Sequence, residues 1–290
     1  MSSAYGEGSP EASDDMTRVI ACHLAFQVVE PAEVAIQVVA AGRAGEVLDE
    51  RFEVTTDGSR PLSLMEFRTD QGERLHVILS RPGLLVVDYR AELRARPLRP
   101  VSATGAGQAF GYERELHLRP SRYCPSDHLV GFAVAEFGTD TDVVRRTAVI
   151  TEWIRHRINY VPGSSDVHDS AEHTLLTGMG TCRDFAHLGI ALCRATGIPA
   201  RFTAVYAPGL YPMDFHAVFE TLQDGRWSVH DPTGLAPRSS LVRIVTGRDA
   251  ADTAFSSINS GVATLEDVEV TATVGSVLPR DNLTDTVELP

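Results

Sequence analysis

Residues 178–196 read GMGTCRDFAHLGIALCRAT, and this stretch decides how the second half of the chain folds. Two glycines precede Cys182, and the residues after it are apolar over most of a helical circumference. A helix that is apolar on most of its faces is usually central and buried. Gly197 and Pro199 then supply the signals that end a helix. The stretch therefore predicts a buried central helix over residues 183–196, with a cysteine at its start.

Cys182 is predicted to lie where the backbone bends and a helix begins. Glycines allow the bend and a close approach of substrate. The unpaired N–H groups and partial positive charge of a helix start favour the thiolate, which is the reactive form of cysteine. Arg183 acts in the same direction and Asp184 opposes it, whereas Cys193 lies among apolar neighbours and should be inert. We therefore expect Cys182 to be a nucleophile, with helix-start N–H groups contributing to an oxyanion hole.

The segment after this helix is expected to contain three strands, over residues 200–206, 214–222 and 226–231. Asp224 and Gly225 separate the last two, and this dipeptide is a strong signal for a two-residue hairpin turn. Such a turn fixes which residues of the two strands face each other. The second and third strands are therefore predicted to form an antiparallel hairpin in a defined register.

His216 and Asp231 are predicted to lie on one face of this hairpin. A two-residue turn pairs Leu222 with Trp227 and Val218 with Asp231, which leaves His216 diagonal to Asp231 on the same face. Diagonal neighbours are about 7–8 Å apart at the backbone, within reach of two polar side chains. A three-residue loop would reverse this parity. With the thiol of the preceding helix, the pair would complete the nucleophile, base and orienting acid of covalent acyl transfer.

Six segments of the chain carry a resemblance to a known family. They are residues 180–188 (GTCRDFAHL), 197–201 (GIPAR), 215–217 (FHA), 230–233 (HDPT), 247–252 (GRDAAD) and 120–124 (PSRYC). Their residue types, on a helix followed by two strands, resemble the transglutaminase-like superfamily. The resemblance covers about residues 115–275, and residues 18–110 are similar to the β-rich region that precedes this domain in bacterial members.

The resemblance implies an α+β fold with a papain-like transglutaminase core, preceded by an all-β sandwich-like domain. In that core a helix carrying Cys182 packs on an antiparallel sheet carrying His216 and Asp231, and the three residues form a catalytic triad. Relatives include protein crosslinkers, peptidases and deglycosylating amidases, and some members have lost the triad and only bind. No acidic cluster of the calcium-binding type found in animal crosslinking enzymes is evident, so neither metal nor cofactor is expected.

We therefore expect a thiol-dependent enzyme that transfers or hydrolyses amide bonds of a protein or peptide through a thioester. The alternative is a non-catalytic peptide- or protein-binding module on the same fold. Each residue has a structural explanation by itself: Cys182 as a small buried side chain, His216 as a strand histidine, and Asp231 as a turn initiator before Pro232. The three together favour catalysis.

The chain is predicted to contain two folding units after a disordered tail over residues 1–17, because 290 residues exceed what one compact domain usually needs. Period-two alternation between turn clusters predicts a β-rich N-terminal domain over residues 18–110. Residues 95–111, rich in Pro, Gly and Ala, are expected to connect it to a catalytic domain over residues 111–290.

Two further helices are expected in the second domain. Apolar residues at spacings of three and four predict one over residues 141–159, with Asp140 or Asp142 as its N-cap. A shorter helix is expected over about residues 170–177.

Other polar residues are interpreted as structural. His187 follows Cys182 by five residues, which is poor spacing for a metal pair on a helix, so it is expected at the surface or in packing, with a supporting role near the site as an alternative. Arg248, Asp249 and Asp252 are expected to form a salt-bridged loop against the core.

The composition disfavours several partners. The formal net charge of -13 opposes nonspecific binding to nucleic acid or anionic membrane, because both need a positive surface. No stretch has the apolar length of a signal peptide or a transmembrane span. Four cysteines are few for a disulfide scaffold. We therefore expect a cytoplasmic bacterial protein without nucleic-acid or membrane partners.

Overall fold

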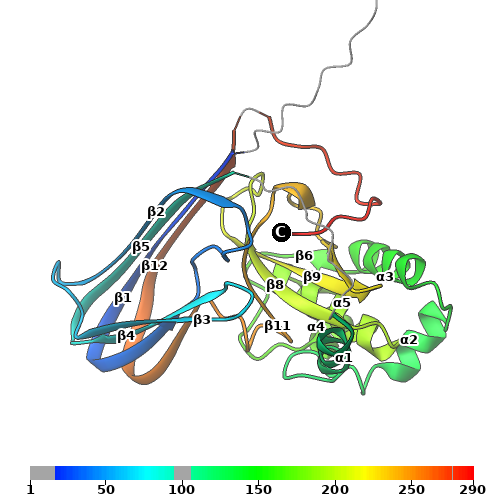
Figure 1. Cartoon of the computed structure of the whole chain (residues 1–290). Coiled ribbons are helices and arrows are strands. Elements are labelled where there is room, and N and C mark those ends of the chain that lie inside the picture. Colours follow the sequence, from blue (N-terminus) through cyan, green and yellow to red (C-terminus); the bar gives the residue numbers. More distant parts are fainter. Residues whose placement is uncertain (1–16, 95–105, 276) are drawn as a thin grey trace, which may run out of the picture.

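The computed structural model describes residues 17–94, 106–275 and 277–290. The expected tail, apart from Thr17, and most of the expected connection lie outside these ranges. The described chain has a β-rich part, on the left of Figure 1, and a mixed α/β part, on the right. This is the fold class expected from the sequence: a β-rich N-terminal region followed by an α+β core.

The strands of the β-rich part form one curled antiparallel sheet in the order β2-β5-β1-β4-β3, and β12 runs along the other side of β1. Their bounds are β1 Thr17–Ile36, β2 Glu46–Thr56, β3 Ser63–Arg68, β4 Arg74–Ser80, β5 Gly83–Arg94 and β12 Ser256–Val274. β12 pairs with β1 along its length, from Arg18 opposite Val274 to Ile36 opposite Ser256. The end of the expected second domain thus completes the first sheet, and the division near residue 110 stays a prediction.

The second sheet is antiparallel, in the order β10-β9-β8-β11. Its strands are β8 Ala200–Tyr206, β9 Phe215–Gln223, β10 Arg226–His230 and β11 Val242–Gly247. The first three strands were predicted to within one residue at each end, whereas β11 was not predicted. A short 3-10 helix, η1 Arg238–Ser240, precedes β11.

Five helices lie in the described part of the chain: α1 Ala106–Leu116, α2 Val130–Phe137, α3 Val143–Arg157, α4 Ala171–Thr177 and α5 Cys182–Ala195. The predictions of α3, α4 and α5 are confirmed, and Asp142 caps α3 by accepting a hydrogen bond from the Arg145 N–H at 3.0 Å. α1 and α2 were not predicted. α2 is short, almost wholly apolar and preceded by Leu129, which provides no side-chain cap. None of the described helices is both long and apolar enough to span a membrane.

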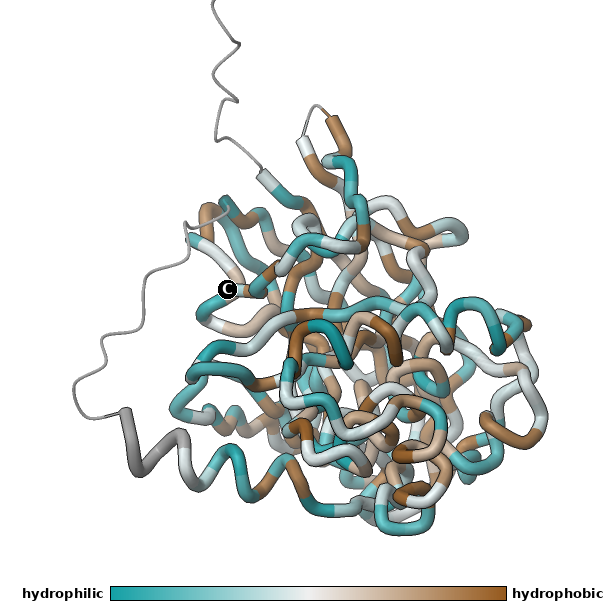
Figure 2. The backbone as a smooth tube through the Cα atoms, turned by 90° about the vertical axis from the view of Figure 1, so that its right-hand side faces the viewer, coloured by the Kyte–Doolittle hydropathy of each residue, from teal (hydrophilic) through white to brown (hydrophobic). Residues whose placement is uncertain are grey.

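α5 is the central helix of the α/β part and packs directly on β9. Its residues from Asp184 to Arg194 are all buried. Gly189 faces the Phe219 ring so closely that an added Cβ would lie 2.5 Å from a ring carbon. Hydrophobic residues gather toward the centre of this part (Figure 2). The glycine therefore sets the distance between the helix and the sheet.

Replacing Gly189 with alanine should destabilise the protein by about 1–3 kcal/mol, because the new methyl group must displace a buried ring. Gly131 in α2 is a matched control, since an added Cβ there meets nothing within 4 Å. Gly131→Ala should stabilise the protein by about 0.5–1 kcal/mol through the unfolded chain. Urea unfolding of both variants measures the difference, and equal signs would contradict the packing argument.

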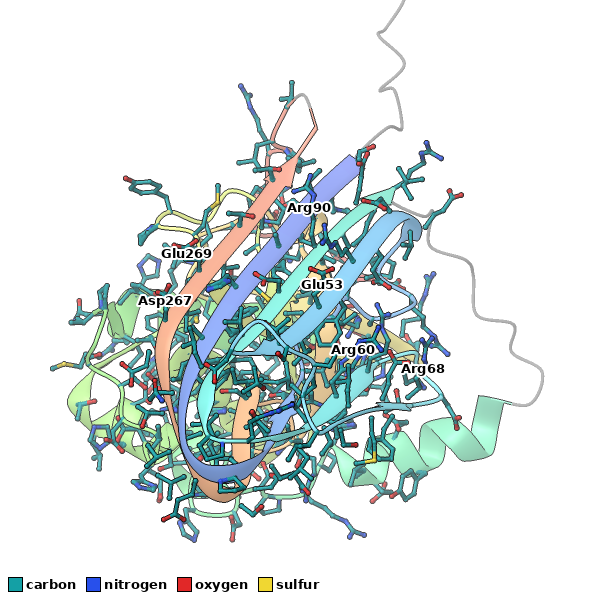
Figure 3. All side chains as sticks on the ribbon, turned by 90° about the vertical axis from the view of Figure 1, so that its left-hand side faces the viewer. Glu53, Arg60, Arg68, Arg90, Asp267 and Glu269 are labelled. Carbon is teal, nitrogen blue, oxygen red and sulfur yellow. The ribbon has the colours of Figure 1, made fainter. Side chains whose placement is uncertain are left out.

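The two sheets are joined by hydrogen bonds and a shared apolar cluster. The Tyr206 hydroxyl donates to the Val38 carbonyl at 2.7 Å, and the Thr246 hydroxyl donates to a Glu73 carboxylate oxygen at 2.6 Å. Tyr206, Val242 and Ile244 pack in one cluster with buried residues of the first sheet. The outer face of that sheet carries charged side chains instead, among them Glu53, Arg90 and Glu269 (Figure 3). The first sheet therefore packs against β8 and β11 and supports them.

Candidate active site

The two glycines before Cys182 are needed for different reasons. Gly178 ends α4 with φ 69°, a left-handed conformation that favours glycine. Gly180 lies against the following helix, where an added Cβ would come within 2.6 Å of the Asp184 Cβ. Between them the chain forms the short strand β7 Met179–Gly180, which pairs with β6 Asn159–Tyr160. The Gly-Met-Gly sequence thus allows a sharp turn of the backbone and a close approach to the start of α5.

Cys182 is the first residue of α5, as the sequence predicted. Thr181 is the N-cap, and the Asp184 carboxylate accepts hydrogen bonds from the Thr181 N–H at 2.8 Å and the Thr181 hydroxyl at 3.1 Å. This capping box fixes the first turn. The Cys182 side chain is half-buried at the helix end, where first-turn N–H groups lack intrahelical partners. The helix start therefore places a partial positive charge beside the thiol.

The hairpin register predicted from the turn is confirmed. Leu222 pairs with Trp227, and the two residues between the strands, Asp224 and Gly225, have φ values of 49° and 78°. Two positive φ values define the two-residue turn that the sequence signal requires. Asp231, directly after β10, therefore lies on the predicted face of the hairpin.

His216 and Asp231 form a fully buried hydrogen-bonded pair. The His216 Nε2 lies 2.9 Å from the Asp231 Oδ2, and neither side chain is exposed to solvent. The other carboxylate oxygen of Asp231 accepts from the Thr233 N–H at 2.9 Å and from its hydroxyl at 2.6 Å. Both carboxylate oxygens are thus occupied, and the Asp231 side chain is locked toward His216.

The pair holds a proton on His216. Burial by itself lowers the pKa of His216, but the charge and hydrogen bond of Asp231, with smaller contributions from Cys182, raise it to about 10. Burial likewise opposes ionisation of Asp231, yet the charge of His216 and the hydrogen bonds from His216 and Thr233 lower its pKa. The second ring nitrogen of His216, Nδ1, has no hydrogen-bond partner among the described residues. An imidazolium beside the Cys182 side chain is the expected state at neutral pH.

Three groups that support the site were not singled out from the sequence. Thr233 orients Asp231 as described, and Arg155 from α3 donates to the main-chain oxygens of Asp231 at 3.1 Å and Pro232 at 3.3 Å. Tyr160 interacts electrostatically with Cys182. Burial, followed by the charge of Cys182, raises the pKa of Tyr160 to about 12. Thr233 stood in a quoted motif, whereas Arg155 and Tyr160 had no local signal.

His187 is a packing residue, and the surface alternative is wrong. Its ring is fully buried, stacks on Tyr123 at 5.1 Å and accepts a hydrogen bond from the Ala250 N–H at 3.1 Å. Burial, followed by the charge of Arg183, lowers the pKa of His187 to about 3, so the ring is neutral. It ties α5 to the loop after β11.

That loop is salt-bridged, as expected. The Arg248 guanidinium and the Asp252 carboxylate lie 2.9 Å apart, and Asp249 accepts from the Tyr123 N–H at 2.9 Å. The ion pair lies within the loop, and the contact between Asp249 and Tyr123 holds the loop against the core.

The other cysteines are unsuited to nucleophilic chemistry. Cys22, Cys124 and Cys193 are buried, whereas Cys182 is half-exposed. Burial raises the pKa of Cys124 and of Cys193 to about 12, which keeps both as thiols. Cys182 is therefore the one accessible thiol among the four.

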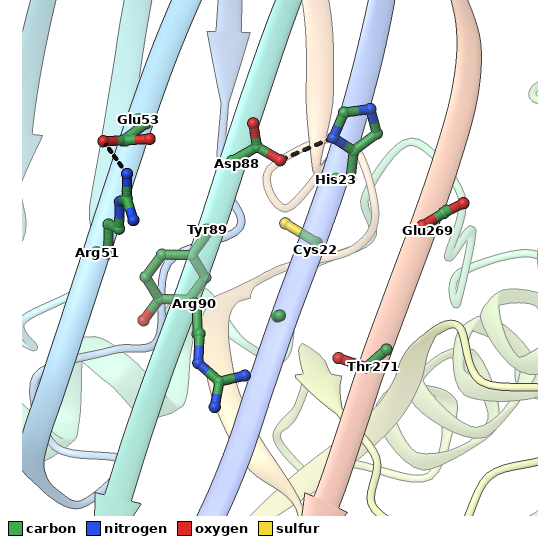
Figure 4. A pocket seen from close by; sticks show the side chains of 10 residues that line it. Cys22, His23, Arg51, Glu53, Asp88, Tyr89, Arg90, Glu269 and Thr271 are labelled. Carbon is green, nitrogen blue, oxygen red and sulfur yellow. Dashed lines mark hydrogen bonds and ion pairs between the residues drawn. The ribbon is translucent and has the colours of Figure 1, made fainter.

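A hollow of about 370 Å³ lies elsewhere, on the outer face of the first sheet (Figure 4). Four of the side chains that line it pair with each other: His23 with Asp88 and Arg51 with Glu53, each at 2.7 Å. Across residues 17–94, 106–275 and 277–290, no group of three or more His, Cys, Asp or Glu side chains is arranged to hold a metal ion. The hollow belongs to a solvated sheet face and adds no chemistry to the site.

Comparisons with known proteins identify the family of this chain. A family model described as "Transglutaminase-like superfamily" matches residues 133–232, which include all three candidate residues. The crystal structure of a "Putative Cysteine Protease" from Cytophaga hutchinsonii is 34% identical, covers 96% of each chain and superposes with a TM-score of 0.80. An uncharacterized protein of Mycobacterium leprae is 30% identical over 148 residues, 47% of this chain and 52% of that protein. The match thus spans about half the length of this curated relative.

Fold, family model and full-length structural likeness agree. The chain belongs to the transglutaminase-like superfamily.

Proposed function

We propose that this protein is a thiol-dependent enzyme that breaks amide bonds in peptides or proteins and passes the acyl group to water or to a second amine. In this proposal Cys182 is the nucleophile, His216 the proton donor and acceptor, and Asp231 the residue that orients His216. The observation that carries the proposal is the buried 2.9 Å hydrogen bond between His216 and Asp231, beside the one accessible thiol.

The electrostatics of the site support this assignment. A nucleophilic cysteine needs a cationic neighbour and access to substrate. The raised pKa of His216 supplies the cation through neutral pH, and the start of α5 supplies further positive potential. The superfamily and the name of the Cytophaga hutchinsonii protein point to the same chemistry.

The reaction would proceed in two steps. The Cys182 thiolate attacks the amide carbonyl carbon, with the oxyanion near the first N–H groups of α5. Collapse of the tetrahedral intermediate breaks the C–N bond, and His216 gives its proton to the departing amine, which leaves a thioester on Cys182. Neutral His216 then takes a proton from water or an amine as that molecule attacks the thioester. The products are the acid or a new amide, with the thiolate–imidazolium pair restored.

Alkylation of the four cysteines with iodoacetamide separates an enzyme from a binding module. In an enzyme, Cys182 should react well below the pH at which an ordinary thiol is alkylated, because His216 is cationic there. His216→Ala should move that reaction to ordinary thiol pH. Labelling followed by peptide mass spectrometry measures both. Ordinary labelling of Cys182 that His216→Ala leaves unchanged would favour a binding module.

Mass spectrometry of substrate mixtures separates hydrolysis from transfer. A glutamine peptide and a protein library are incubated with the enzyme, with and without an added primary amine. Hydrolysis of a peptide bond gives two fragments, whereas transfer to the added amine gives a mass increase that depends on its presence. Cys182→Ala is the control for both reactions.

A further inference from the structure

Residues 277–290, called the strap below, return from the end of β12 to the second sheet (Figure 1, red). β10 is the edge strand of that sheet, so one side of it lacks a partner strand. The strap occupies this side: the Val229 N–H donates to the Val287 carbonyl at 2.8 Å. A main-chain donor that would otherwise face solvent is thereby satisfied.

An ion pair joins the strap to η1 beside the end of β10. The Asp281 carboxylate accepts from the Arg238 N–H at 2.8 Å, from its Nε at 2.9 Å and from its Nη2 at 2.9 Å. Arg238 also donates through Nη1 to the Val229 carbonyl at 3.2 Å. Arg238 is buried, and a two-pronged guanidinium–carboxylate contact fixes direction as well as distance. Asp281 thus aims an arginine at the strand that ends next to Asp231.

Apolar contacts bring the strap against the loops on both sides of this strand. Leu289 is buried in one cluster with side chains of β8, β9 and β10. Leu283 lies 3.5 Å from where a Cβ on Gly234 would be, in the loop that follows Asp231. Leu278 lies 2.8 Å from the corresponding position at Gly209, in the loop that leads to β9. The strap therefore touches the segments that carry both members of the histidine–aspartate pair.

We infer that Asp281 of the strap is a positioning residue of the proposed active site, which acts through Arg238 and holds the end of β10 so that Asp231 meets His216. This inference rests on the proposed function. β10 is five residues long and lies at a sheet edge. Without Asp281, Arg238 loses its partner and the Val229 carbonyl loses a fixed donor. The Asp231 loop then gains freedom exactly where a hydrogen bond to His216 must be kept.

The pKa of His216 depends on three ionisable side chains around its ring. Asp231 faces the ring from the loop after β10, Cys182 from α5, and Asp214 from the residue before β9. Asp231 is the largest favourable contribution to the raised pKa of His216. Displacing Asp231 should therefore make His216 less cationic, and the Cys182 thiol should need a higher pH to react.

Asp281→Asn tests the inference, because asparagine keeps the size and removes the charge. We expect kcat to fall by about 10- to 100-fold with KM little changed, as for a misplaced orienting group. Iodoacetamide labelling of Cys182 should shift to higher pH. Glu288→Gln is the matched control: Glu288 pairs with Arg226 at 3.1 Å at the other end of β10, and its loss should leave both readouts unchanged.

Arg238→Lys keeps the charge and loses the two-pronged contact, so it repeats the test if Asp281→Asn does not fold. A folded variant with wild-type kcat and a wild-type labelling profile would overturn the inference, even if it melted at a lower temperature. Failure of the proposed function looks different. In that case the wild type shows no turnover, while the labelling profile still reports whether Asp281 acts on His216.

Discussion

Replacing Cys182 with alanine should abolish turnover, with a loss of about 10⁴-fold or more in kcat. In the proposed mechanism the thioester forms on the Cys182 sulfur, and the other three cysteines are buried, so none can substitute. The variant should fold, because the side chain is only half-buried and its removal leaves the capping box intact. Peptide cleavage by wild type and variant, compared at equal folded concentration, measures the loss.

Cys193→Ala is the control for this experiment. It removes a thiol from the same helix, but from a buried position among apolar residues. Its rate should match the wild type once the folded fraction is corrected for, although its stability should fall. Full activity of Cys182→Ala on any amide substrate would show that the nucleophile has been assigned to the wrong residue.

The hairpin was predictable because its information is local. A two-residue turn fixes the register of both strands, so Asp224 and Gly225 sufficed to place His216 and Asp231 on one face. The helix start was predictable for a similar reason, since two glycines and an apolar run follow one another in sequence. The close packing of Gly189 on Phe219, which joins helix and hairpin, could only be seen in the structure.

The remaining features depend on contacts between distant segments. β12 pairs with β1 across more than two hundred residues, and nothing within its own sequence names that partner. Arg155 reaches the Asp231 loop from another helix. Asp281 is likewise an ordinary acidic residue until the chain returns past η1. Such residues gain their roles from tertiary structure, which a single sequence does not encode in any local pattern.

Asp184 shows how structure changes an interpretation made from charge. From the sequence it appeared to oppose the thiolate, because it places a negative charge two residues after Cys182. In the structure its carboxylate accepts from the Thr181 N–H and hydroxyl, and it is buried. The Asp184 carboxylate therefore stabilises the first turn of α5, and this turn presents the Cys182 thiol.

Replacing Asp231 with asparagine should lower kcat by about 10²–10⁴-fold, because the amide no longer fixes the orientation and charge of His216. It should also move the alkaline limit of kcat downward. In the wild type that limit is the loss of the His216 proton, with a pKa of about 10. Without the carboxylate the pKa of His216 should fall, since only the smaller contributions of Cys182 then oppose the effect of burial. A pH–kcat profile of both proteins measures the shift, and an unchanged alkaline limit would contradict it.

The same variant also tests how the pair of His216 and Asp231 contributes to the free energy of unfolding at different pH values. His216 has a raised pKa in the folded protein, so its stabilisation is full below the ordinary histidine pKa of 6.5 and disappears as pH rises through about 10. Asp231 has a lowered pKa, so its stabilisation holds above 3.8 and is lost as pH falls through its folded value. The stability gap between wild type and Asp231→Asn should therefore be widest at intermediate pH and close above pH 10. Urea unfolding across this range measures the gap, and a gap that persists above pH 10 would mean that Asp231 stabilises the fold mainly through Thr233.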